Sequence, residues 1–144
     1  MIKMKFEKLS PERKAFFKKR LEQSPELAPL RNRLLEIDGL EIVPRLESDL
    51  SKLMTQGRVF DLGVELRLMR RSGCHENAAK LWRENRKDNK ICTGWGLSDD
   101  GLWRQHTWVI SNEKIIETTE VRIKYFGVIF SEGEAERFAI SNLS

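Results

Sequence analysis

Apolar residues recur at helical spacing in the first half of the chain. The sequence Ser-Pro-Glu at residues 10–12 is typical of a helix start, with a capping hydroxyl, a proline at the first helical position and an acid in the first turn. The same sequence recurs at 24–26, before a leucine stripe over residues 27–35. Gly39 is expected to end this second helix. A third helical stripe covers residues 46–54 and is followed by Gly57.

The alternating segment 64–68 fits either a helix or a strand. After residue 71 the pattern changes, because Ser72-Gly73 interrupts regular structure. Alanine, leucine and tryptophan side chains then recur at helical spacing, which predicts a helix from Cys74 to about residue 87. Strand-like runs separated by polar turns follow at residues 91–97, 105–110, 114–119 and 125–130. A short helix is expected over residues 132–140.

This order predicts an α+β fold, with N-terminal helices followed by a cysteine-bearing helix packed on an antiparallel β-sheet. The 144 residues fit a single domain, mainly helical over 1–70 and built from a helix and a sheet over 71–144. The hydrophobic fraction of 40% is sufficient for one core, and the charged fraction of 33% is typical of a soluble protein. No apolar run approaches the roughly 20 residues of a membrane span.

The N-terminal segment is basic and lacks the apolar run of a secretion signal, so we expect a cytoplasmic protein whose cysteines stay reduced. The net charge is +4. It arises in residues 1–60, which carry 13 basic and 9 acidic residues. This basic half either binds nucleic acid or an acidic protein, or forms ordinary solvated helix faces.

Cys74 lies where a nucleophilic cysteine is favoured. At the first turn of a helix, the positive end of the helix dipole stabilises a thiolate. The free backbone N–H groups there can also bind an oxyanion, and Gly73 lets a substrate approach the backbone. The simpler interpretation is that the cysteine is a small packed hydrophobe.

Two histidines could serve as its base. His75 is adjacent to Cys74, and neighbouring side chains on a helix point about 100° apart, so His75 is poorly placed. His106 lies in a predicted strand. If residues 112–113 form a two-residue hairpin loop, residues 106, 108, 117 and 119 share one face of the sheet. Glu117 is then the acid that orients His106, whereas a three-residue loop would favour Glu120.

A metal site is the competing interpretation of these residue types. Cys74, His75, Cys92 and His106 are all zinc-ligand types, but their spacing matches no zinc motif. Cys92 lies in an apolar run and is expected to pack in the core. We therefore expect neither a metal nor a cofactor.

The segment Gly-Cys-His-Glu-Asn-Ala-Ala-Lys-Leu-Trp, residues 73–82, resembles the cysteine helix of papain-like enzymes, particularly their transglutaminase-like branch. His106-Thr107-Trp108 resembles the H-x-W strand of that branch, and residues 115–119 resemble its acid-bearing strand. The resemblance covers roughly residues 70–130 and implies Cys74 as nucleophile, His106 as general base and Glu117 as orienting acid. Glu117 replaces the commoner Asp.

The resemblance also raises the question of the oxyanion donor, because no glutamine lies just upstream of Cys74 where papain-type enzymes carry one. The Cys74 backbone N–H with either Gln105 or Asn77 would then supply the donors. Three tryptophans are expected to form core or cleft wall, and the one after the turn at residues 99–101 is expected to border a substrate groove; they are Trp95, Trp103 and Trp108.

The sequence thus predicts a thiol hydrolase or acyltransferase, such as a peptidase, amidase or deamidase, acting on an amide of a protein or peptide. The alternative is a non-catalytic binding protein of the same fold that uses its basic N-terminal half.

Overall fold

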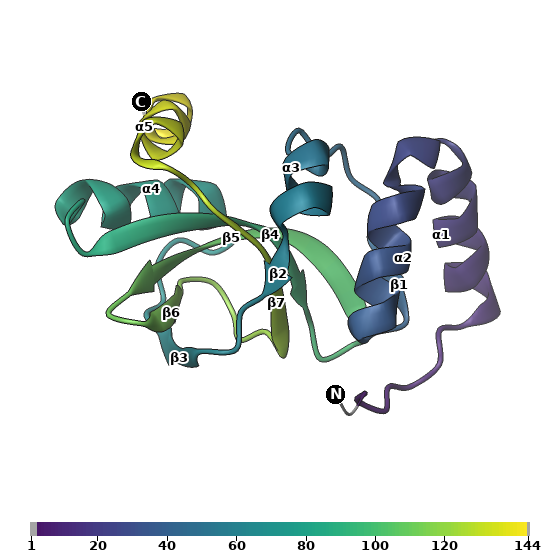
Figure 1. The fold of residues 1–144 in the computed structure, drawn as a ribbon. Coiled ribbons are helices and arrows are strands. Elements are labelled where there is room, and N and C mark those ends of the chain that lie inside the picture. The colour runs from purple at the N-terminus through teal and green to yellow at the C-terminus, as the bar shows by residue number, and fades with distance from the viewer. Residues whose placement is uncertain (1–2, 144) are drawn as a thin grey trace.

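The computed structural model describes residues 3–143 and has an α+β fold, as predicted (Figure 1). Within these residues a mostly antiparallel seven-stranded sheet is combined with five α-helices and one 3-10 helix. The helices are α1 (Pro11–Glu22), η1 (Pro25–Leu27), α2 (Ala28–Ile37), α3 (Leu50–Gln56), α4 (Cys74–Glu84) and α5 (Glu132–Asn142). The strands are β1 (Glu41–Ile42), β2 (Arg58–Val59), β3 (Gly63–Leu66), β4 (Asn89–Leu97), β5 (Leu102–Ser111), β6 (Lys114–Glu117) and β7 (Lys124–Ile129). None of the helices in this part of the chain is both long enough and apolar enough to cross a membrane.

The predicted helix start at Ser10 is confirmed, because the Ser10 side chain accepts a hydrogen bond from the Arg13 backbone N–H. The third helix is shorter than its stripe suggested. It begins at Leu50 rather than near Leu46, whose side chain is 84% exposed and takes no part in the core. The cysteine-bearing helix likewise ends at Glu84, three residues before the predicted end.

The strands lie in the order β2-β7-β4-β5-β6-β3, and β1 pairs with β5 apart from this path. The β4, β5, β6 and β7 pairings are antiparallel, as expected for hairpin-connected strands. Two parallel pairs are additions that the sequence pattern did not predict, β1 with β5 and β3 with β6. The ambiguous segment 64–68 is therefore largely the edge strand β3.

The β5–β6 hairpin has the predicted two-residue loop. Asn112 and Glu113 both have positive φ, 50° and 62°, as a type I′ turn requires. Ser111 pairs with Lys114, and the ladder continues to Val109 with Ile116. This register places His106 and Glu117 on the same face of the sheet.

Helices cover the sheet at two ends (Figure 1). Helices α2 and α3 pack against one end through a core that includes Leu34, Leu53 and Trp95. Helices α4 and α5 pack against the other end through Ala79 and Val109, among others. A third buried cluster contains Phe60, Cys92, Trp108, Ile115 and Tyr125. This third cluster surrounds the side chains of the candidate site.

Candidate active site

Cys74 is the first residue of α4, and Gly73 is the helix N-cap. No side chain caps this helix, so the N–H groups of its first turn are not used by a capping residue. The Cys74 side chain is partly exposed. The thiol therefore lies at the positive end of a helix dipole and is open to a substrate.

Asn77 fixes the start of this helix. Its Nδ2 donates to the Arg70 carbonyl at 2.8 Å and to the Thr118 hydroxyl at 3.2 Å, and its side chain is buried. Both amide hydrogens are thus used to join α4 to the preceding turn and to the segment after β6. The expectation that Asn77 donates to an oxyanion is wrong, because its donors face the protein interior.

His106 lies on β5 beside Glu117 and is 1% exposed. Its Nε2 is 2.7 Å from Glu117 Oε1. The ring stacks on Trp108, with 5.9 Å between centroids, and lies 6.2 Å from the Tyr125 ring. Because Glu117 engages Nε2, Nδ1 is the nitrogen left for the Cys74 thiol. The Trp108 and Tyr125 rings also contact one another, with 5.1 Å between centroids, and together they restrict the orientation of the imidazole.

Glu117 is fully buried, and both of its carboxylate oxygens accept hydrogen bonds. Oε1 accepts from His106 and from the Tyr125 hydroxyl, the latter at 2.8 Å. Oε2 accepts from the backbone N–H and the hydroxyl of Thr119, at 3.0 and 3.1 Å. Burial by itself raises the pKa of this carboxyl, but the hydrogen bond and charge of His106 outweigh burial and lower the pKa to about 2. Glu117 is therefore a fixed anion.

The Cys74 thiol and the His106 ring each shift the pKa of the other. Burial raises the pKa of Cys74, but its interaction with His106 and a hydrogen bond from the Thr107 backbone N–H together lower that pKa below its ordinary value. Burial lowers the pKa of His106, whereas Cys74 and Glu117 outweigh burial and raise it. Both shifts favour a thiolate beside an imidazolium.

His75 and Cys92 lie outside this arrangement. His75 Nδ1 is 2.6 Å from the Thr107 hydroxyl, and its ring packs edge-on against Phe138. Cys92 is completely buried, and this burial raises the pKa of its thiol. Among residues 3–143, no group of three or more histidine, cysteine, aspartate or glutamate side chains is placed to hold a metal ion.

Glu120 does not contact His106. Its carboxylate is 65% exposed and pairs with Arg122 at 2.7 Å. In the observed two-residue hairpin register, Glu117 rather than Glu120 contacts His106, as the sequence predicted for a loop of this length.

The three tryptophans are completely buried. Trp103 donates its indole N–H to the Asp38 carbonyl at 2.8 Å and packs in the core beneath α2. The expectation that Trp103 borders a substrate groove is therefore wrong, because β1 and the segment before it cover the strand there. Trp95 is in the same core and donates to Glu47. Trp108 alone touches the site, beneath His106.

A cavity of about 310 Å³ opens over Cys74 and His106. Gln105 lines it, with its side-chain nitrogen turned to the Leu46 carbonyl at 3.0 Å and to Glu47 at 3.2 Å. Gln105 thus reaches the cavity wall, but its amide hydrogens are engaged elsewhere in this conformation.

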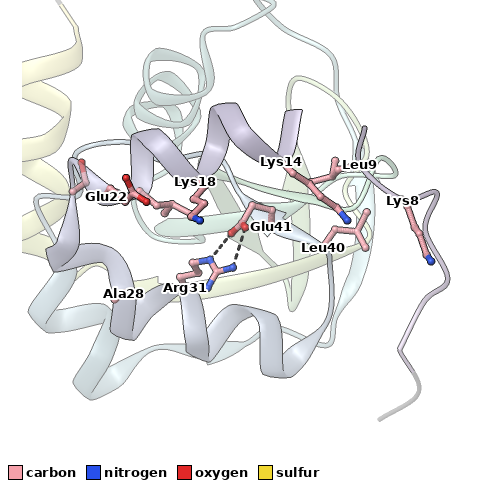
Figure 2. Close-up of a pocket in the computed structure, with 11 residues that line it drawn as sticks. Lys8, Leu9, Lys14, Lys18, Glu22, Ala28, Arg31, Leu40 and Glu41 are labelled. Atoms are coloured by element: carbon pink, nitrogen blue, oxygen red, sulfur yellow. Dashed lines mark hydrogen bonds and ion pairs between the residues drawn. The ribbon is translucent and has the colours of Figure 1, made fainter. Parts of the chain in front are cut away.

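A larger cavity of about 760 Å³ lies between α1, α2 and β1 (Figure 2). Lys14 and Lys18 extend toward it from α1, and Arg31 and Glu41 form an ion pair at 2.5 Å within it. Its lining includes no cysteine or histidine, and it shares no lining residue with the Cys74 cavity. The smaller cavity is the better candidate site because the groups with coupled pKa shifts line it.

Two partners of Glu117 were not assigned a role from the sequence. Tyr125 is the only tyrosine of the chain and reaches Glu117 from β7. Thr119 follows Glu117 by two residues, a spacing at which a side chain and a backbone N–H can both turn back to the carboxylate.

Comparisons of the chain with family models, with curated proteins and with solved structures found no match.

Proposed function

We propose that this protein is a thiol hydrolase or acyltransferase that acts on an amide bond of a protein or peptide. The observation that supports it best is the buried 2.7 Å contact between His106 and Glu117, with Cys74 beside the free edge of the imidazole. A buried charged pair is costly to form, and pairs of this kind are concentrated at functional sites.

In the proposed reaction, the Cys74 thiolate attacks the amide carbonyl carbon and forms a C–S bond. The carbonyl π electrons move to oxygen and return as the C–N bond breaks, while the His106 imidazolium gives its proton to the departing amine. The product of this step is a thioester on Cys74 with neutral His106. His106 then takes a proton from water, or from an acceptor amine, which attacks the thioester and releases the Cys74 thiolate.

The oxyanion that forms in each step needs hydrogen-bond donors. The uncapped first turn of α4 offers the backbone N–H of Cys74. Gln105 is the side chain nearest to serving as a second donor, provided that its amide turns from Leu46 into the cavity. This chemistry requires a reduced thiol, which agrees with the proposal of a cytoplasmic location.

The test is the pH dependence of Cys74 alkylation by iodoacetamide in native Cys92→Ala protein. An apparent pKa below that of a free thiol is expected, rising toward the free-thiol value in His106→Ala. His75→Ala is the matched control and is expected to leave the profile in place, because the His75 ring bonds Thr107.

If Cys74 titrates like a free thiol both with His106 and in His106→Ala, the proposed function is wrong. The basic N-terminal half would then become the feature to test, as the binding surface of a non-catalytic protein.

A further inference from the structure

One of the residues that line the Cys74 cavity is a nearly buried arginine, Arg122. It lies in the loop between β6 and β7 and lines the cavity that holds Cys74 and His106. Its side chain is only 8% exposed. Among the residues that the structure describes, none accepts a hydrogen bond from its buried Nε. Buried donors without a partner are rare in native proteins and call for an explanation, such as a ligand that is absent.

The sequence provides room for this guanidinium. Gly96 on β4 lies directly beneath it, and a Cβ at that position would come within 3.1 to 3.2 Å of Arg122 Cγ, Cδ and Nε. Any larger residue would push the arginine away from the strand. The placement of Arg122 over the sheet is therefore built into the fold rather than being one of many surface rotamers.

Glu120 neutralises Arg122 only in part. Its carboxylate, which is 65% exposed, forms an ion pair with Nη1 at 2.7 Å, and its backbone carbonyl accepts a hydrogen bond from the same Nη1 at 3.4 Å. A guanidinium has five N–H donors, so these two contacts at Nη1 leave Nε unused. The Nε edge of a guanidinium is one of those that grip a carboxylate through two parallel hydrogen bonds.

Two further arginines line the same cavity. Arg104 lies two residues before His106 on the same face of β5, where Asp100 pairs with it at 2.8 Å. Arg45 is exposed at the other side of the opening. No aspartate or glutamate of the described chain lines this cavity. Because Arg104 and Arg122 each pair with one carboxylate, the positive charge at the entrance to the thiol comes mainly from Arg45.

We infer that the Cys74 site selects substrates that carry a carboxylate close to the amide carbonyl, with Arg122 as its principal ligand and Arg45 as a second. This inference rests on the proposed function and adds a substrate class to it. Arg122 is the specificity residue because it is buried, held in place over Gly96 and unpartnered at Nε. The carboxylate would bind the part of the guanidinium that lines the cavity, and a shift of the side chain would bring the buried Nε into contact with it, while the carbonyl meets the thiolate.

The experiment compares two alkylating probes that differ only in charge. Iodoacetate carries its carboxylate directly on the electrophilic carbon, and iodoacetamide is its neutral counterpart of nearly the same shape. Rate constants for both are measured on Cys74 in the Cys92→Ala protein at one pH. The ratio of the two rate constants cancels any change in the thiolate fraction, so it reports on recognition of the carboxylate alone.

Arg122→Gln is expected to lower the iodoacetate-to-iodoacetamide ratio by about tenfold, and Arg45→Gln by a smaller factor. Arg83→Gln is the matched control, since Arg83 is exposed near the far end of α4 and its loss changes the net charge equally. The control ratio should stay within about twofold of the parent ratio, because a distant exposed charge is screened by salt. If Arg122→Gln does not fold, the Arg45→Gln ratio compared with the Arg83→Gln ratio decides the question.

The outcomes separate the two proposals. Ratios that are unchanged in both cavity variants overturn the carboxylate inference and leave the thiol chemistry intact. A Cys74 that reacts with neither probe overturns the proposed function, and the inference with it. Because the His106 imidazolium also attracts iodoacetate, only the difference between variants counts as support.

Discussion

His106 and Glu117 meet at 2.7 Å with exposed fractions of 1% and 0%, so the pair has no contact with bulk water. Removing two charges from water costs several kcal/mol per ion before their attraction is counted. Glu117 meets this cost through hydrogen bonds from Tyr125 and Thr119. The carboxylate is therefore an anion fixed behind the imidazole, and this arrangement keeps His106 able to hold a proton.

Replacement of Glu117 by glutamine should raise the apparent pKa of Cys74 toward that of a free thiol. Glutamine is neutral, so it no longer supports the imidazolium that stabilises the thiolate. The measurement is the pH profile of iodoacetamide alkylation in the Cys92→Ala background. Glu113→Gln is the control, because Glu113 is an exposed glutamate in the hairpin loop. Equal profiles for both variants would show that the buried carboxylate has no influence on the thiol.

The same pair predicts a pH dependence of stability. Glu117 has a pKa near 2 in the folded protein against an ordinary value of 4.5. A lowered pKa stabilises the folded state above the unfolded pKa, and this stabilisation is lost as the pH falls through the folded pKa. The free-energy difference between wild type and Glu117→Gln should therefore be constant between about pH 5 and pH 6, where the His106 contribution is also fully present, and shrink by about 3 kcal/mol toward pH 2.

Chemical denaturation of both proteins at a series of pH values measures this difference. His106 adds the opposite trend, because a raised pKa stabilises the folded state at low pH and this contribution is lost as the pH rises through the folded pKa. A difference that is flat from pH 6 to pH 2 would mean that Glu117 is not ionised in the folded protein.

The parts of the fold that sequence reasoning predicted correctly depend on local signals. Ser10 caps its helix, and Asn112 with Glu113 adopts the positive φ values of a two-residue hairpin loop. Once that loop length is known, strand alternation places His106 and Glu117 on one face, without any knowledge of the rest of the sheet.

The parts that it missed depend on contacts between distant segments. Arg122 reaches the cavity from a loop 48 positions after Cys74, and β3 pairs in parallel with β6, so no local spacing indicates either contact. Trp103 follows a polar turn and was expected to border a substrate groove, but β1 pairs with its strand and its side chain is completely buried. Burial of an aromatic side chain is decided by which element covers it, and that is tertiary information.

Thiol counting should find one reactive cysteine in the native protein and two after denaturation. Cys74 is partly exposed, whereas Cys92 is enclosed by the cluster around Trp108 and its pKa is raised by burial. A disulfide reagent such as Ellman's reagent gives both counts. Loss of the native count in Cys74→Ser, with its retention in Cys92→Ala, assigns the reactive thiol. Two fast thiols in the native protein would contradict the packing of Cys92.

Lys124→Met should lower the free energy of unfolding by about 3 kcal/mol, because it leaves the buried Asp38 carboxylate without its cation. Lys124 Nζ lies 2.6 Å from Asp38 Oδ2, and Asp38 is 1% exposed. Lys90→Met, at an exposed lysine, is the control and should change stability by less than about 0.5 kcal/mol. Urea denaturation measures both, and a loss of equal size in the two variants would remove the special role of the Lys124 pair.

Tyr125→Phe tests whether the hydrogen bond from Tyr125 to Glu117 stabilises the carboxylate without controlling the pKa of Cys74. The Tyr125 hydroxyl donates to Glu117 Oε1, so its loss should raise the pKa of Glu117 and move the acid limb of unfolding to higher pH. The lost hydrogen bond to a charged group should cost about 1.5–3 kcal/mol. The apparent pKa of Cys74 should stay low, because the ionised Glu117 still faces His106 at neutral pH. If Tyr125→Phe instead raises the Cys74 pKa as far as Glu117→Gln does, the tyrosine proton itself controls the charge on the imidazole.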